Sequence, residues 1–136
     1  MNYLLDACAL FALIAGEQGE DIVNDLLERA ENNETSVFMC RINLLEIYYN
    51  HIRDLGIDRA DEIIDSVYAS PIQIIEEIDE LTFREAAILK AGYRISLADS
   101  IALANAKTLD LTIVTSDHHE LDIVEQNEPI QFLWIR

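Results

Sequence analysis

Short apolar runs alternate with segments of helical periodicity along the chain. Five runs are rich in β-branched or aromatic apolar residues and predict buried strands. They span residues 2–5, 35–40, 71–77, 111–115 and 130–135. Strands that alternate with helices predict an α/β fold of three layers, in which a mostly parallel central sheet of about five strands is flanked by helices.

The helices between these strands are predicted from apolar residues that recur on one face. They cover residues 7–16, 20–33, 41–56, 58–70, 81–93 and 96–110. Gly56 suits the position just past a helix end, and Thr82 with Glu85 matches a capping box. A further short helix is expected after Asp117, which is spaced from Glu120 as a capping residue would be.

Length and composition indicate one globular domain over residues 1–136, with 51% hydrophobic residues and only 4 Gly and 2 Pro. Cys8 and Cys40 form no metal-binding pattern and are interpreted as buried, reduced thiols. The apolar start of the chain is too short to span a bilayer, lacks a preceding basic residue and is interrupted by Asp6. We therefore expect a cytoplasmic protein with no membrane segment.

Four acidic residues are predicted to meet at one edge of the sheet, because functional groups of parallel α/β sheets lie beyond the carboxyl ends of the strands. Asp6 follows the first strand, Glu46 lies in the helix after the second, Asp99 opens a helix, and Asp117 follows the fourth strand. Taken singly, three of them are ordinary helix caps and Glu46 an ordinary solvated residue.

Taken together, these carboxylates would destabilise the fold. Two of them ~5 Å apart repel by roughly 3 kcal/mol at an effective dielectric constant of ~20. A divalent cation removes that repulsion. Oxygen ligands without a histidine or thiolate framework suit Mg²⁺ or Mn²⁺ rather than zinc.

Four segments in this order resemble the PIN domain family: LLDACALFALI, INLLEIYYN, SLADSIALANA and IVTSDHHELD. The closing FLWIR is similar to the ends of many small members. The resemblance covers essentially the whole chain and is to the single-domain toxin ribonucleases of type II toxin–antitoxin modules. It implies an endoribonuclease dependent on Mg²⁺ or Mn²⁺ that cleaves single-stranded or loop RNA with a metal-activated water. The products would carry a 5′-phosphate and a 3′-hydroxyl.

The same resemblance implies roles for individual residues and partners. The catalytic acidic quartet would be Asp6, Glu46, Asp99 and Asp117. Direct metal ligands would be Asp6 and Asp99, joined by Asp117, which like Glu46 would act partly through metal-bound water. Thr115 and Ser116 would support the site by hydrogen bonding, and Asn43 would orient Glu46 from one turn away. A homodimer and a cognate antitoxin are also implied.

The net charge of −17 opposes this interpretation, because RNA binding normally uses Lys and Arg to neutralise phosphates. Arg41, Lys90 and Arg94 are the candidate substrate-binding residues, expected as a small positive rim, although a solvated surface role suits each at least as well. A basic antitoxin segment would also fit an acidic cleft. His118 and His119 are adjacent and point in different directions, which favours a surface role over joint metal binding.

Other apolar and aromatic residues have two open interpretations. Tyr48 and Tyr49 either stack on bases or pack the helix. Ile63, Ile64 and Tyr68 either complete the core or extend it into a dimer face.

Competing functions are tested by position. A haloacid-dehalogenase-type phosphatase needs a second Asp where Cys8 stands, and a response-regulator receiver needs an acidic pair after the first strand. The stronger rival is a non-catalytic PIN-fold module that binds a basic protein partner. Binding of a divalent metal ion distinguishes the two functions, because the nuclease needs a cation site and the binding module does not.

Overall fold

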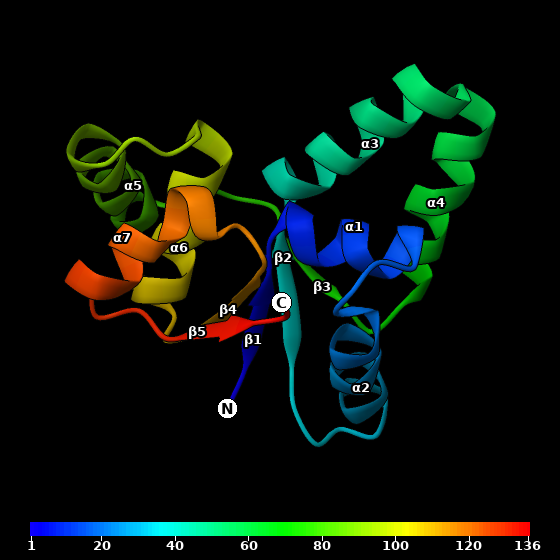
Figure 1. Ribbon diagram of the computed structural model, residues 1–136, viewed down its shortest axis with the longest axis horizontal. Coiled ribbons are helices and arrows are strands. Elements are labelled where there is room, and N and C mark those ends of the chain that lie inside the picture. Colours follow the sequence, from blue (N-terminus) through cyan, green and yellow to red (C-terminus); the bar gives the residue numbers. More distant parts are fainter.

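A computed structural model describes residues 1–136 and contains five strands and seven helices (Figure 1). The strands are β1 (Tyr3–Leu5), β2 (Val37–Cys40), β3 (Gln73–Ile75), β4 (Thr112–Thr115) and β5 (Phe132–Trp134). The helices are α1 (Ala7–Ala15), α2 (Glu20–Glu31), α3 (Arg41–Leu55), α4 (Ile57–Ala69), α5 (Glu80–Gly92), α6 (Leu97–Thr108) and α7 (His118–Asn127). All predicted elements are present. None of the helices has both the length and the apolar character that crossing a membrane requires.

The strands form a single sheet in the order β3-β2-β1-β4-β5, and every neighbouring pair is parallel. Central strand β1 pairs Leu4 with Phe38 of β2 and with Ile113 of β4. The predicted α/β class is confirmed, and the sheet is wholly rather than mostly parallel. Because all five strands run the same way, the residues that follow β1, β2 and β4 meet at one edge.

Helices cover both faces of the sheet and give two separate cores. Figure 1 shows α1, α2 and α4 on one side and α5, α6 and α7 on the other. Successive strand residues point to opposite faces. Accordingly, Leu5 and Met39 pack into the core under α1 and α2, whereas Leu4 and Ile113 pack into the core under α6 and α7. Apolar strands without polar alternation are the consequence of this double burial.

Helix α6 is buried along most of its length, which explains its alanine-rich sequence. The buried residues are Ala98, Ser100, Ile101, Ala102, Leu103, Ala104, Asn105 and Ala106. The side-chain amide of Asn105 on this helix forms hydrogen bonds with residues of two other elements. Asn105 Nδ2 donates to Cys40 Sγ at 3.1 Å, and its Oδ1 accepts from the Thr82 hydroxyl at 3.2 Å. Small residues and a satisfied amide let α6 pack closely, so its first turn is held firmly at the sheet edge.

The start of α5 differs from the prediction. The Asp79 carboxylate caps this helix by accepting from the Thr82 backbone N–H at 2.8 Å. Thr82 lies inside the helix, and Glu85 binds Lys107 at 2.6 Å. The predicted capping box of Thr82 with Glu85 is therefore wrong. Asp79 is an equally good capping residue three positions earlier, and the Thr82 hydroxyl donates to Asn105 of α6 instead.

Gly19, at the start of α2, is expected to tolerate no side chain. Its φ is +102°, and an added Cβ would lie 2.8 Å from both Cβ and the carbonyl oxygen of Ile135. Strained backbone and overpacking should make Gly19→Ala less stable by about 3 kcal/mol. Gly92→Ala is the matched control, because Gly92 has open space around it and no positive φ. Thermal unfolding measures both, and equal melting temperatures would contradict the expectation.

The two cysteines are free thiols, as predicted. Cys40 is buried, and burial raises the pKa of its thiol to about 11 despite the hydrogen bond from Asn105. Cys8 is only half-buried, in the first turn of α1.

Candidate active site

Asp6 directly follows β1 and is held in place by β4 and α1. Its backbone N–H donates to the Val114 carbonyl of β4 at 3.2 Å. Its side chain caps α1, with Oδ1 accepting from the Ala9 N–H at 2.9 Å. The residue is only 1% exposed. The capping role is real, and it also orients the carboxylate at the edge where β1 ends.

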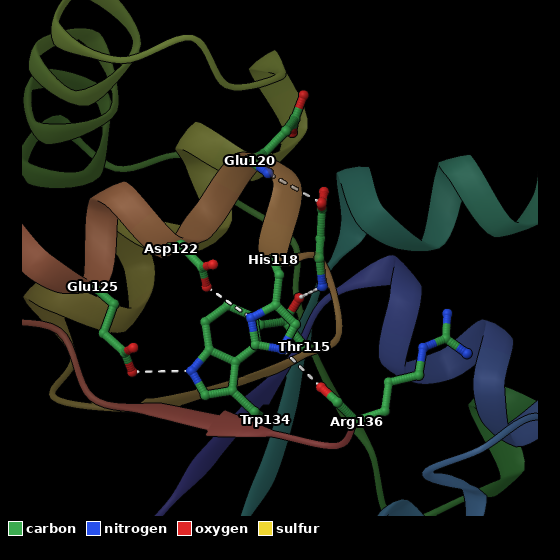
Figure 2. Close-up of polar contacts among 8 residues, drawn as sticks. Thr115, His118, Glu120, Asp122, Glu125, Trp134 and Arg136 are labelled. Carbon is green, nitrogen blue, oxygen red and sulfur yellow. Dashed lines mark hydrogen bonds and ion pairs between the residues drawn. The ribbon is translucent and has the colours of Figure 1, made fainter.

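Asp117 and Glu120 lie together in the first turn of α7. Asp117 caps this helix by accepting from the Glu120 N–H at 3.2 Å, and its own N–H donates to Thr115 Oγ at 3.1 Å (Figure 2). Residues three apart on a helix face the same side. The short turn after β4 therefore brings two carboxylates to the sheet edge.

Asp99 joins this pair from the opposite helix. It lies in the first turn of α6, where the Ser96 hydroxyl caps the helix by accepting from the Asp99 N–H at 3.1 Å. One carboxylate oxygen from each of Asp99, Asp117 and Glu120 lies within 4.8 Å of the other two. The fold thus gathers three carboxylates from two elements that are far apart in sequence.

The pKa values connect Asp6 and Glu46 to the same group. The pKa of Asp6 rises from 3.8 to about 6, mainly through burial and further through the charges of Asp117 and Glu46, while hydrogen bonds from the Thr115 side chain and the Ala9 backbone lower it. The pKa of Asp99 is raised by burial, by contact with the Glu120 carboxylate and by the charge of Asp6. Burial and the charge of Glu120 also raise the pKa of Glu46.

We call these five residues the acidic cluster: Asp6, Glu46, Asp99, Asp117 and Glu120. None of them takes part in an ion pair, although ion pairs occur elsewhere on the surface. Glu46 also has a buried carboxylate oxygen with no hydrogen-bond partner. Unpaired oxygen donors that repel one another fit a hard divalent cation such as Mg²⁺ or Mn²⁺.

The predicted supporting residues have different surroundings. Thr115 is fully buried and contacts both Asp6 and Asp117, as a supporting residue should. The Ser116 carbonyl accepts from the His118 N–H at 3.1 Å. Asn43 is 0% exposed, but its amide has no hydrogen-bond partner and is not bonded to Glu46.

The three cations predicted as a rim are not joined to the acidic cluster by any ion pair. Arg41 begins α3 and lines hollows with Leu45 on that helix. Lys90 lines an apolar hollow between α5 and α6, and Arg94 is exposed in the connection between those helices. The hollows that Arg41 and Lys90 line contain no residue of the acidic cluster.

Glu120 is not among the predicted site residues. Its spacing from Asp117 predicts a capping pattern, and the structure has one, because the Glu120 backbone N–H is the capped group. The same spacing aims both side chains to one side. A carboxylate three residues after a candidate ligand on a helix is therefore the signal that marks it.

His118 has a structural role beside the cluster. Its ring stacks on Trp134 of β5, with centroids 3.9 Å apart. Its Nδ1 contacts Asp122 at 2.7 Å and its Nε2 the Arg136 carbonyl at 2.8 Å (Figure 2). Both partners are hydrogen-bond acceptors, and this arrangement favours the protonated imidazolium form of the ring. Asp122 accordingly raises the pKa of His118.

The remaining aromatic and apolar candidates mostly pack. The Tyr48 hydroxyl donates to Asp61 at 2.6 Å, whereas Tyr49 is exposed. Ile63 is buried and Ile64 packs against the same core, while Tyr68 is exposed on α4.

Comparison with known proteins identifies the family and the fold. The chain matches the family model described as "PIN domain" over residues 3–125, and no curated protein matches it. VapBC2 from Rickettsia felis bound to a promoter DNA fragment is similar, with a TM-score of 0.76, 16% identity and 98% coverage of both chains. DNA-bound VapBC from Salmonella typhimurium has a TM-score of 0.75, 15% identity and coverage of 100% of this chain and 99% of that one.

A third similar structure is the Mycobacterium tuberculosis toxin VapC20, which cleaves the sarcin-ricin loop. Its TM-score is 0.66 at 13% identity, with coverage of 92% of this chain and 95% of that one. At such identities these structures show a shared fold. The family model spans most of the sequence, and the chain therefore belongs to the PIN domain family.

Proposed function

We propose that this protein is an endoribonuclease dependent on Mg²⁺ or Mn²⁺, the cytoplasmic toxin of a toxin–antitoxin pair. One observation carries the proposal: Asp99, Asp117 and Glu120 present carboxylate oxygens within 4.8 Å of one another, and no cationic side chain pairs with them. Membership of the PIN domain family supports a nuclease.

The proposed roles follow from the surroundings of each side chain. Asp99, Asp117 and Glu120 would hold the cation, and buried Asp6 would add negative charge beside them. When bound, the ion would lower the pKa of a water and offset the charge of the phosphate. Glu46 has the unpartnered oxygen and the raised pKa expected of a group that accepts a proton from the attacking water.

The proposed partners are single-stranded or loop RNA, a cognate antitoxin and a second copy of the chain. Loop RNA is suggested by the description of VapC20 as cleaving the sarcin-ricin loop. VapBC-5 from Mycobacterium tuberculosis, a further similar structure, is described as a member of the VapBC family of toxin–antitoxin systems, which suggests a protein partner here too. A net charge of −17 favours a basic antitoxin segment.

Calorimetric titration with Mn²⁺ tests the proposal without knowledge of the RNA target. Wild-type protein should bind Mn²⁺, and Glu120→Gln should weaken binding about tenfold, because one ligand charge is lost. Glu125→Gln is the matched control, since it removes the same charge from the same helix outside the acidic cluster. Cleavage of single-stranded RNA should need Mn²⁺ or Mg²⁺ and stop in EDTA.

Two results would contradict the proposal. Absence of Mn²⁺ binding by folded wild type would favour the non-catalytic module that binds a basic partner. Equal weakening in Glu120→Gln and Glu125→Gln would mean that Mn²⁺ responds only to the general negative charge of the surface.

A further inference from the structure

A hollow of about 310 Å³ lies beside the acidic cluster. It is lined by Cys8, Phe11 and Ala15 of α1, by Glu17 and by Arg136. Cys8 is two residues from Asp6, in the turn that Asp6 caps. The hollow and the acidic cluster therefore adjoin at Cys8.

Arg136 is held at this place by contacts of its own backbone and that of its neighbour. The Ile135 N–H donates to the Thr115 carbonyl at 3.0 Å, and the Arg136 carbonyl accepts from His118 at 2.8 Å. The stack of His118 on Trp134 braces this end of the chain. Figure 2 shows the Arg136 carbonyl directed to His118 and its side chain extending the other way, toward α1.

The guanidinium of Arg136 is also free of ion pairs. Five of the nine Lys and Arg side chains pair with carboxylates, namely Arg29, Arg53, Arg59, Arg84 and Lys107. Arg136 belongs to the unpaired remainder. Among those four, it alone shares a hollow with a residue of the turn that carries Asp6. In a chain with a net charge of −17, such a cation is the available anchor for an anionic ligand.

We propose that this hollow binds the RNA nucleotide next to the cleaved phosphodiester, with Arg136 holding its phosphate and Phe11 contacting its base. The inference rests on the proposed function. A guanidinium matches a phosphate with two parallel hydrogen bonds. Single-stranded nucleic acid is commonly held by a cation that follows the backbone and an aromatic ring that stacks on a base. The volume is at the lower end of ligand pockets, which suits one nucleotide.

The test measures RNA binding apart from cleavage. A fluorescein-labelled single-stranded RNA is titrated with protein in Ca²⁺, which shares the oxygen-ligand preference of Mg²⁺ without its strict octahedral geometry. Arg136→Gln should weaken binding about tenfold and reduce the slope of log affinity against log salt by about 0.7, the value for one phosphate on a single strand. Arg84→Gln is the control, because it removes a similar charge from an exposed ion pair on α5.

Mn²⁺ calorimetry on the same variants separates this inference from the proposed function. Loss of a positive charge should not weaken Mn²⁺ binding, so Arg136→Gln should bind Mn²⁺ at least as tightly as wild type. If Arg136→Gln and Arg84→Gln bind RNA with equal affinity and equal salt slope while wild type binds Mn²⁺ and cleaves RNA, the inference alone is wrong. If wild type neither binds Mn²⁺ nor cleaves RNA, both fall.

Discussion

Asp99→Asn is expected to lower metal-dependent RNA cleavage by about 10³-fold, equivalent to about 4 kcal/mol of transition-state stabilisation. The substitution keeps the shape of the side chain and removes one of three charges whose oxygens lie within 4.8 Å. An amide oxygen is a weaker ligand for a hard cation than a carboxylate, so the variant should also need more Mn²⁺. Initial cleavage rates at saturating Mn²⁺ measure the effect.

The same variant should be more stable than wild type when metal is absent. Asp99 is repelled by Glu120 and Asp6, and its burial adds a further cost of ionisation. Removing that charge should stabilise the metal-free protein by about 2 kcal/mol. A variant with lower activity and higher stability than wild type is expected when the substituted residue serves function at a cost in stability.

Asp110→Asn is the matched control for Asp99→Asn. Asp110 lies just after α6, and its φ of +54° is a conformation that Asn adopts readily. This control should change neither cleavage nor stability measurably. If Asp99→Asn cleaves RNA at the wild-type rate, Asp99 is not needed for cleavage, and its only role is that of an acidic residue in the first turn of α6.

The contrast between Asp6 and Glu120 shows how far the sequence could predict this site. Asp6 follows an apolar strand, and parallel topology alone places it at the functional edge. Glu120 can be predicted as a site residue only if the start of the helix after β4 is known. That start depends on the turn that Thr115 and Asp117 form. A capping pattern and a ligand pattern have the same spacing, so only the position of Asp99 on the neighbouring helix distinguishes them.

Cationic residues were the least predictable part. Arg41 and Lys90 are close in sequence to site elements, but each lines a hollow other than the one that Arg136 lines, because long side chains follow local packing. Arg136 reaches the hollow beside Cys8 through pairing of β5 with β4 and through the His118 contact, neither of which has a local sequence signal. By contrast, the alternation of apolar runs with helical segments predicted a sheet flanked by helices, because burial on both faces of a sheet leaves a direct mark on composition.

Without metal, the protein should lose stability as pH rises from about 4 to about 7. The folded-state pKa of Asp6 is about 6 against an ordinary 3.8. Between these values the folded state binds more protons than the unfolded state, so stability falls with increasing pH in that window. The difference of about 2 pKa units corresponds to about 3 kcal/mol, fully present below the lower value and lost above the higher one. The raised pKa values of Asp99 and Glu46 act in the same direction.

Asp6→Asn separates this effect from the general repulsion of a chain with a net charge of −17. Asparagine caps a helix as well as aspartate does, so α1 should keep its hydrogen bond to the Ala9 N–H. Urea unfolding in EDTA should therefore show a shallower fall with pH in the variant. Mn²⁺ should restore stability to wild type at high pH, because a ligand that binds only the folded state shifts unfolding by mass action. Identical pH profiles for the two proteins would mean that burial does not raise the pKa of Asp6 in the folded protein.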